Sequence, residues 1–278
     1  MKSLRYIGAL AIAGMGLLAA ACDTIEKDDY KNPYTGIISS DRYVLLEDYT
    51  GVRCTNCPTA AAEIARLQEF YGANLIVVGM HPNGVTMAMP HSGDPDLRTD
   101  AAKEYFDGFQ MTSLPAGLVN RKPTIYGYAE WGGAVAEVIS NELTYATLSV
   151  SAALGSGDTT LSINVSGEFI EDYKEDGAIN VLTMILEDSI VVKQSNNDPS
   201  LGGDELEGYV QNHVLRQVVG STWGDRVLGE APDRGSAVAA AYNVSLNPAW
   251  RTNHLSVVVA LVNADSREVI QAAQVHVE

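Results

Sequence analysis

Two cysteines that stand two residues apart, Cys54 and Cys57, are the residues of this sequence best placed to carry out chemistry. A short apolar run ends at Gly51 just before them, and an alanine-rich helical pattern begins straight after them. The start of a helix presents unpaired N–H groups and a partial positive charge, which stabilise a thiolate. Because the thiolate is the nucleophilic form of cysteine, this arrangement suits a pair that exchanges with other thiols and disulfides, and the alternative is a permanent disulfide in a binding scaffold.

The elements that must hold this pair follow from the hydrophobic pattern of residues 43–144. The predicted elements are, in chain order, a strand at Val44–Leu46, a helix at Thr59–Tyr71, a strand at Leu75–Val78, a helix at Pro95–Gln110, a strand at Ala116–Val119 and a helix at Trp131–Leu143. A strand, a Cys-x-x-Cys and a helix in this order are typical of a thioredoxin-like domain, so the fold class predicted for this part is α/β.

The resemblance to thioredoxin-like sites implies a role for single residues. Cys54 would be the exposed nucleophile and Cys57 the buried resolving thiol. Asp48, six residues before Cys54, matches the buried acid that assists proton transfer to the resolving thiol. Glu47 is the alternative, and strand alternation sends these two side chains to opposite faces.

A proline later in the chain completes this resemblance. Leu114-Pro115 stands before a predicted strand, where thioredoxin-like proteins have a cis-proline that lies against the cysteines. Pro115 would then present substrate backbone to the pair; the alternative is an ordinary trans proline. Two features depart from the pattern, because Arg53 replaces the usual aromatic residue and Thr55-Asn56 replaces the usual pair between the cysteines.

From residue 145 the sequence changes to alternating, β-branched runs. Predicted strands lie at Thr147–Ala153, Thr160–Phe169, Asn180–Leu186, Tyr209–Val219, Ala237–Leu246, Leu255–Val262 and Ile270–Val277. Strands at this spacing predict an all-β domain over residues 145–278, an immunoglobulin-like β-sandwich. Ser195–Gly208 is polar and rich in glycine and acidic residues, and is expected to be an exposed loop.

The first 21 residues predict a targeting segment. Lys2 and Arg5 precede an apolar stretch, and Leu18–Cys22 resembles the lipobox at which a signal peptidase cuts before a lipidated cysteine. Cys22 is therefore the predicted lipidation site. The alternatives are an ordinary secretory signal or a spanning helix. Residues 22–42 are polar and are expected to form a tether.

The composition and charge of the chain restrict the kinds of partner that it can bind. The 278 residues are 46% hydrophobic and 19% charged, which is typical of a globular protein. The formal charge of −17 excludes nucleic acid as a partner, because no basic surface is available to displace phosphate counterions. If Cys22 carries lipid, one cysteine pair remains, and an exported compartment allows Cys54 and Cys57 to form a disulfide.

The two parts together resemble the 28-kilodalton-type outer-membrane lipoproteins of Bacteroidota. In the first part, the resemblance rests on Leu46-Glu-Asp-Tyr-Thr-Gly51 leading into Cys54-Thr-Asn-Cys-Pro58 and on the strand that ends at His81. In the second part it rests on two motifs, Tyr209-Val-Gln-Asn-His-Val-Leu-Arg216 and Trp223-Gly-Asp225. It implies a thioredoxin-like domain followed by an immunoglobulin-like domain and a lipid anchor in the outer membrane. Lys27-Asp28-Asp29 resembles the signal that sends such lipoproteins to the cell surface rather than the periplasmic face.

Three function classes stay open. The first is thiol–disulfide exchange on exported proteins, with no cofactor. The second is a surface binding module, an adhesin or an accessory subunit of an outer-membrane transporter, in which Cys54–Cys57 is a permanent disulfide. The third is copper handling by the methionine and histidine side chains of Met80–His91, which are ligands that suit Cu(I). The alternative is that these side chains only fill gaps in the core and bind no metal. His213, expected near Tyr209 on a strand, is interpreted as a core or interface histidine.

Overall fold

A computed structural model describes residues 41–277 of the chain. The targeting segment at 1–21, the lipidation site Cys22, the Lys27-Asp28-Asp29 signal and most of the tether lie outside the described residues, so those predictions stay predictions.

The first part is built on a β–α–β unit. It consists of β1 (Val44–Tyr49), α1 (Cys57–Tyr71) and β2 (Leu75–Met80), and the two strands pair in parallel from Val44↔Leu75 to Tyr49↔Met80. A third strand, β3 (Ala116–Val119), pairs antiparallel to β1. The remaining helices are α2 (Asp100–Gly108) and α3 (Trp131–Asn141). Short 3-10 turns lie at Gly72–Asn74, Thr86–Ala88, Tyr128–Glu130 and Thr252–His254.

Residues of β1 alternate between the two faces of this sheet. Val44 and Leu46 pack with α1 and α3, whereas Leu45 and Tyr49 pack with α2 on the other face. Because side chains alternate along a strand, Glu47 lies on the α2 face and Asp48 on the α1 face. This alternation decides which of the two carboxylates can reach the cysteines.

The second part contributes ten strands to the described part of the chain. They are β4 (Ala146–Leu154), β5 (Thr160–Phe169), β6 (Ala178–Glu187), β7 (Ile190–Ser195), β8 (Glu205–Gln211), β9 (Val214–Val219), β10 (Asp225–Glu230), β11 (Ala237–Ser245), β12 (Leu255–Asn263) and β13 (Val269–His276). Three sheets result. The order of the largest is β13-β12-β6-β9-β2-β1-β3, with β10 also paired to β6; the others are β11-β5-β4 and β7-β8.

The largest sheet runs through both parts of the chain. It is joined where β9 lies parallel to β2, at the pair Gly79↔Val214, and Gly79 N donates to the His213 carbonyl at 2.8 Å. A Cβ at position 79 would stand 3.4 Å from that carbonyl oxygen, which is an ordinary van der Waals contact. The immunoglobulin-like topology and the boundary between residues 144 and 145 stay predictions.

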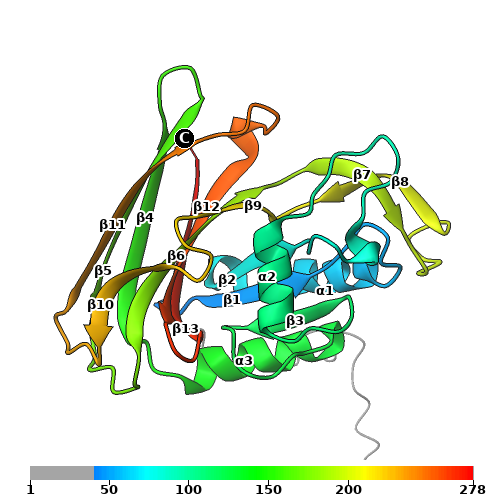
Figure 1. The fold of residues 1–278 in the computed structure, drawn as a ribbon. Coiled ribbons are helices and arrows are strands. Elements are labelled where there is room, and N and C mark those ends of the chain that lie inside the picture. The colour runs from blue at the N-terminus through cyan, green and yellow to red at the C-terminus, as the bar shows by residue number, and fades with distance from the viewer. Residues whose placement is uncertain (1–40, 278) are drawn as a thin grey trace, which may run out of the picture. The chain divides into compact units, whose positions relative to one another are not determined.

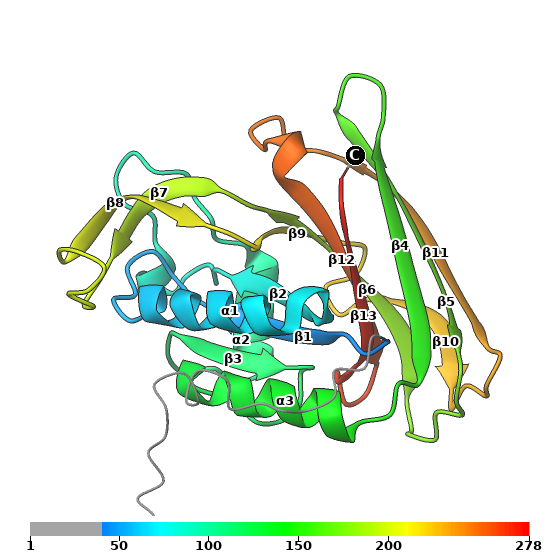
Figure 2. The same ribbon diagram turned by 180° about the vertical axis from the view of Figure 1, so that it is seen from behind.

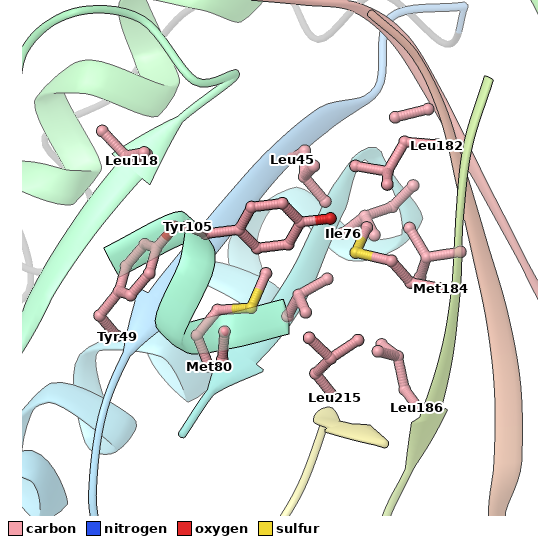
Figure 3. Close-up of a cluster of buried hydrophobic side chains, with 14 of the residues drawn as sticks. Leu45, Tyr49, Ile76, Met80, Tyr105, Leu118, Leu182, Met184, Leu186 and Leu215 are labelled. Atoms are coloured by element: carbon pink, nitrogen blue, oxygen red, sulfur yellow. The ribbon is translucent and has the colours of Figure 1, made fainter. Parts of the chain in front are cut away.

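Two strands of this sheet, β6 and β12, are buried on both faces. Leu182, Met184 and Leu186 of β6 pack against Leu45, Ile76 and Tyr105 of the first part (Figure 3). Ile179, Val181 and Ile185 of the same strand face the β11-β5-β4 sheet, which lies across a second core (Figures 1 and 2). Burial on both faces explains why these strands are predominantly apolar.

The structure corrects three predictions in the second part. The single strand expected at Tyr209–Val219 is two strands, β8 and β9, which are separated by a positive φ of 58° at His213. Strands β7 and β10 were not predicted. The expected exposed loop at Ser195–Gly208 instead includes the turn and the first strand residues of the β7–β8 hairpin, so that part of it is ordered strand. By contrast, β3 and β5 have the predicted bounds.

Candidate functional site

The cysteine pair lies at the start of α1 and forms a disulfide. The Cα atoms of Cys54 and Cys57 are 5.4 Å apart, and Cys57 is the first residue of the helix, followed by Pro58 in its first turn. Both residues are buried, with 1% of Cys54 and 3% of Cys57 exposed. The expectation that Cys54 is exposed is therefore wrong, and its role as the nucleophile stays a prediction.

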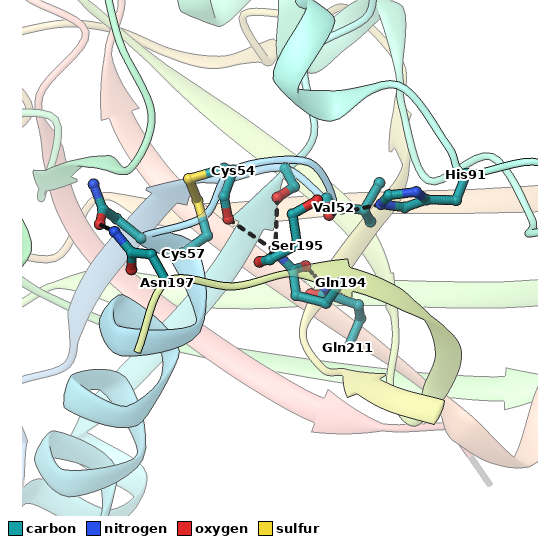
Figure 4. Close-up of a disulfide and its surroundings, with 10 residues drawn as sticks. Val52, Cys54, Cys57, His91, Gln194, Ser195, Asn197 and Gln211 are labelled. Carbon is teal, nitrogen blue, oxygen red and sulfur yellow. Dashed lines mark hydrogen bonds between the residues drawn. A yellow bond between two sulfur atoms is a disulfide. The ribbon is translucent and has the colours of Figure 1, made fainter. Parts of the chain in front are cut away.

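The β7–β8 hairpin covers the cysteine loop from one side (Figure 4). The side-chain Nε2 of Gln194 donates to the carbonyls of Cys54, at 2.9 Å, and Gly51, at 3.2 Å. The backbone N–H of Ser195 donates to Val52 O at 2.8 Å. Gln194 is itself buried and held in place, because Gln211 of β8 donates to its Oε1 at 2.7 Å.

The hairpin also holds the two residues between the cysteines. Asn197 N donates to Thr55 O at 3.1 Å, and its side-chain Nδ2 donates to Asn56 Oδ1 at 2.6 Å. These contacts join positions about 140 residues apart in the chain. The sequence did not predict that Gln194 and Asn197 contact the cysteine loop. For Gln194 the one available signal was a polar residue at an inward-facing position of β7, a strand that was itself not predicted.

A turn at residues 86–91 covers the cysteine loop from another side. Arg53 N donates to Met87 O at 2.8 Å, and the Arg53 guanidinium donates to the carbonyls of Met89 and Pro90. A Cβ at position 51 would lie 2.4 Å from Met87 O, so this contact requires glycine at Gly51. The Arg53 charge is thus engaged with the carbonyls of this turn.

The proline element has the predicted conformation. The Leu114–Pro115 peptide bond is cis, and β3 follows it directly. Leu114 belongs to the same buried cluster as Cys54 and Cys57, whereas Pro115 is half-buried.

Asp48 is a buried carboxylic acid of β1 that lines the same cavity as Cys57. It is 5% exposed, and its Oδ1 has no hydrogen-bond partner. Burial raises the pKa of Asp48 from 3.8 to about 7, because the charged form loses its hydration. At neutral pH this carboxyl group can therefore both accept and donate a proton.

A cavity of about 290 Å³ lies against Asp48 and Cys57. It opens between α1 and the β7–β8 hairpin, and its polar lining includes Thr50, Gln194, Tyr209 and His213. Cys57 lines this cavity and Cys54 does not. Tyr209 and His213 thus share one site although the strand between them is broken. His213 is held by Asp188, whose Oδ1 is 3.4 Å from His213 Nδ1, and burial lowers the pKa of His213.

Glu47, the alternative acid, is engaged elsewhere. It forms a fully buried ion pair with Arg121 on the α2 face, with Arg121 Nε 3.0 Å from both carboxylate oxygens. The guanidinium also lies 4.4 Å from the ring centre of Tyr105 and 5.8 Å from that of Trp223. Glu47 therefore supports the packing of α2, and of the two acids it is Asp48 that lines the cavity together with Cys57.

The second motif, Trp223-Gly-Asp225, secures the second part of the chain to α2. The Trp223 ring packs edge-on against Tyr105 at 5.0 Å and Phe109 at 5.6 Å, and Arg267 lies 3.8 Å above it. Asp225 accepts from Ser221 N and from the Tyr242 hydroxyl. The first motif, Tyr209–Arg216, runs past the cavity, so the two motifs line different parts of the same junction.

The methionine and histidine side chains of the Met80–His91 segment differ in their exposure to solvent. Met80 and His81 are buried, and Met89 is 44% exposed. Burial lowers the pKa of His81 to about 4, and neither of its ring nitrogens has a hydrogen-bond partner. Within residues 41–277 no three His, Cys, Asp or Glu side chains are grouped as a metal site. In the same range, no helix has the length and apolar character to cross a membrane.

Two solved structures share the fold. HBP35 of Porphyromonas gingivalis matches with a TM-score of 0.64 at 15% identity, over 86% of this chain and 76% of that chain. Protein AGR_C_4864 from Agrobacterium tumefaciens matches with a TM-score of 0.50 at 12% identity, over 85% of this chain and 96% of that chain. At these identities the likeness concerns the fold and not the activity. None of the curated proteins matches this sequence.

A family model gives the more specific result. The family described as outer membrane protein Omp28 matches residues 102–278, more than half of the chain, and the match leaves Cys54 and Cys57 outside. A domain of the outer membrane lipoprotein Omp28 from Porphyromonas gingivalis is also similar, with 17% identity over 49% of this chain and 91% of that one and a TM-score of 0.33. The family supports an outer membrane location. The chain belongs to the Omp28 family of outer membrane proteins, the Bacteroidota family that its motifs resemble.

Proposed function

We propose that this protein is a lipoprotein, anchored in the outer membrane through Cys22, whose Cys54–Cys57 pair carries out thiol–disulfide exchange in the cell envelope. Residues 43–144 would form the thioredoxin-like domain that carries the pair, and residues 145–278 an immunoglobulin-like sandwich. The β1-α1-β2 order, with the cysteines at the start of α1 and the proline before β3, supports the first domain.

The observation that carries this proposal is the environment of Asp48. A buried carboxyl group with an oxygen that lacks a hydrogen-bond partner costs stability, and a disulfide that serves only as a structural bridge has no need of such a group. A titratable group shifted to a pKa of about 7 beside a cavity and a cysteine is what acid–base chemistry at neutral pH requires.

Thiol–disulfide exchange at this pair needs one incoming thiolate and one proton donor. An incoming thiolate attacks one sulfur of the disulfide, the S–S bond breaks, and the other sulfur leaves with the electron pair as a thiolate. Protonated Asp48 can supply a proton to the thiolate that forms. In the reverse direction the Asp48 carboxylate accepts a proton from a thiol, which restores the nucleophile.

The reduction potential of the pair tests the proposal. The chain from Asp23 is equilibrated in graded thiol buffers, free cysteines are alkylated, and the alkylated fraction is read by mass. We expect a midpoint above about −300 mV, the range of exchangeable disulfides. A midpoint well below that value marks a structural bridge and overturns the proposal.

A second function is favoured by the burial of both cysteines and by the surface of the hairpin that covers them. Val191 and Val210, which are directly paired across β7 and β8, are 57% and 46% exposed. An apolar pair on a projecting hairpin is the kind of surface that a binding module, such as an adhesin or a transporter accessory subunit, would present. This function predicts that a Cys54→Ser variant that folds retains partner capture, whereas exchange activity is lost.

Surface display is a separate part of the proposal. Its support is the Lys27-Asp28-Asp29 sequence behind the anchor. Treatment of whole cells with a protease should degrade the protein if it faces outward. Full protection in intact cells, with degradation after lysis, would assign the protein to the periplasmic face.

A further inference from the structure

The two cysteines differ in their surroundings. Cys57 lines the cavity, which also contains Asp48, whereas Cys54 lies between the β7–β8 hairpin and the 86–91 turn. Thioredoxin-like sites react through the first cysteine of the pair. In this chain both cysteines are buried, and the second one, Cys57, is the one that lines the cavity.

The backbone of the cysteine loop is already occupied. Ser195 and Asn197 donate to the carbonyls of Val52 and Thr55, and Gln194 donates to that of Cys54 (Figure 4). A polypeptide substrate that paired with the backbone of the cysteine loop would have to displace these hydrogen bonds. The hairpin thus occupies the backbone groups with which such a substrate would pair.

The cavity, by contrast, suits a small molecule. Its volume of about 290 Å³ is at the lower end of small-molecule sites. Its polar lining residues include Asp48, Thr50, Gln194, Tyr209 and His213, and none of its lining residues is a lysine or an arginine. This lining fits a small neutral or cationic thiol better than an anionic one.

We propose that the β7–β8 hairpin is a specificity element, which closes Cys54 to protein substrates and leaves Cys57 open, through the cavity, to low-molecular-weight thiols. This inference rests on the exchange function proposed above and names its substrate class. Gln194 is the positioning residue, because it fixes the hairpin to the carbonyls of the cysteine loop.

In this reaction Cys57 is the attacked sulfur and Cys54 the leaving one, which is the reverse of their order in thioredoxin-like sites. A small thiolate RS⁻ attacks the sulfur of Cys57, and Cys54 leaves as a thiolate. A second RS⁻ attacks the R sulfur of the mixed disulfide, which releases RSSR and the Cys57 thiolate. Two small thiols are oxidised, the protein disulfide is reduced, and the two protons lost by the small thiols are taken up by the two protein thiolates, one of them through Asp48.

Single-cysteine variants test which sulfur is accessible. Cys54→Ser leaves Cys57 and Cys57→Ser leaves Cys54, and each variant is incubated with cystamine, the disulfide of cysteamine. Mass spectrometry follows the mixed disulfide, and circular dichroism checks the fold. We expect Cys57 to react at least tenfold faster than Cys54. Equal rates, or a faster reaction at Cys54, would overturn the proposal.

A second experiment keeps both cysteines. The oxidised chain from Asp23 is reduced either by cysteamine or by a reduced thioredoxin, and the rate constants are compared. We expect the thioredoxin rate constant not to exceed that of cysteamine. Gln194→Ala should raise the thioredoxin rate constant at least tenfold, whereas Gln274→Ala, which removes an exposed glutamine of β13, should leave it unchanged.

The outcomes separate this inference from the function on which it rests. If thioredoxin reduces the wild-type pair faster than cysteamine does, exchange stands and the specificity is wrong. If neither reagent reduces the wild type or Gln194→Ala, the exchange function fails and this inference fails with it.

Discussion

Replacing Asp48 by asparagine should change how the stability of the protein depends on pH. In the folded chain the pKa of Asp48 is raised from 3.8 to about 7, so the folded state holds this proton more tightly than the unfolded state does. The group is therefore neutral and without electrostatic penalty below about pH 4. As the pH rises from 4 to 7, the unfolded chain ionises first, and the folded state loses stability.

The size of this effect follows from the same shift. A difference of about 3 in pKa, at about 1.4 kcal/mol for each pKa unit, corresponds to about 4 kcal/mol at pH 8. Asp48→Asn removes this term at every pH and adds a constant cost for the buried amide. The difference in unfolding free energy between the variant and the wild type should thus move by about 4 kcal/mol in favour of the variant between pH 4 and pH 8.

Urea unfolding of the oxidised chain measures this difference, with tryptophan fluorescence as the signal and with unchanged m-values as the condition for comparison. Asp225→Asn is the matched control. Hydrogen bonds from Ser221 and Tyr242 outweigh its desolvation and lower the pKa of Asp225, so its removal should cost stability at high pH and less at low pH. Parallel pH profiles for wild type and Asp48→Asn would refute the assignment of Asp48 as a buried acid.

Three further substitutions test the packing around the site by their effect on the free energy of unfolding. Glu47→Gln should cost about 3–5 kcal/mol, because it leaves the buried Arg121 charge unpaired, and a Glu47→Gln/Arg121→Met double variant should recover part of the loss. Gly51→Ala should cost about 1–3 kcal/mol, since its Cβ would meet the Met87 carbonyl, and the cysteines of this variant should be reduced faster by thiols. Trp223→Leu should cost about 2 kcal/mol through lost ring and cation–π contacts, and an unchanged urea midpoint would show that this ring does not hold α2.

Local signals in the sequence predicted the part of the site that lies close together along the chain. The strand β1, the cysteines and α1 are adjacent in sequence, so hydrophobic period and motif spacing sufficed to place them. The cis bond at Leu114–Pro115 was predicted from its position before β3. Strand alternation separated Asp48 from Glu47, because a period of two leaves no other arrangement.

The cover over the cysteines could not be predicted in the same way. Gln194 reaches Cys54 across 140 residues, and its strand β7 is six residues long and followed by a polar turn. The sequence pattern of such a short strand does not indicate which distant segment the strand will contact. The burial of Cys54 therefore depends on tertiary contacts alone, and the motif by itself suggested an exposed thiol.

The two-sided burial of β6 and β12 has a consequence for cooperativity. Each strand contributes side chains to two cores, so loosening of either core weakens the packing of the other. Separate opening of the two parts of the chain would expose one face of both strands to water, and this couples them into one cooperative unit. In native-state hydrogen exchange, the amides of β6 and β12 should open only with global unfolding, while those of the β7–β8 hairpin exchange through local opening.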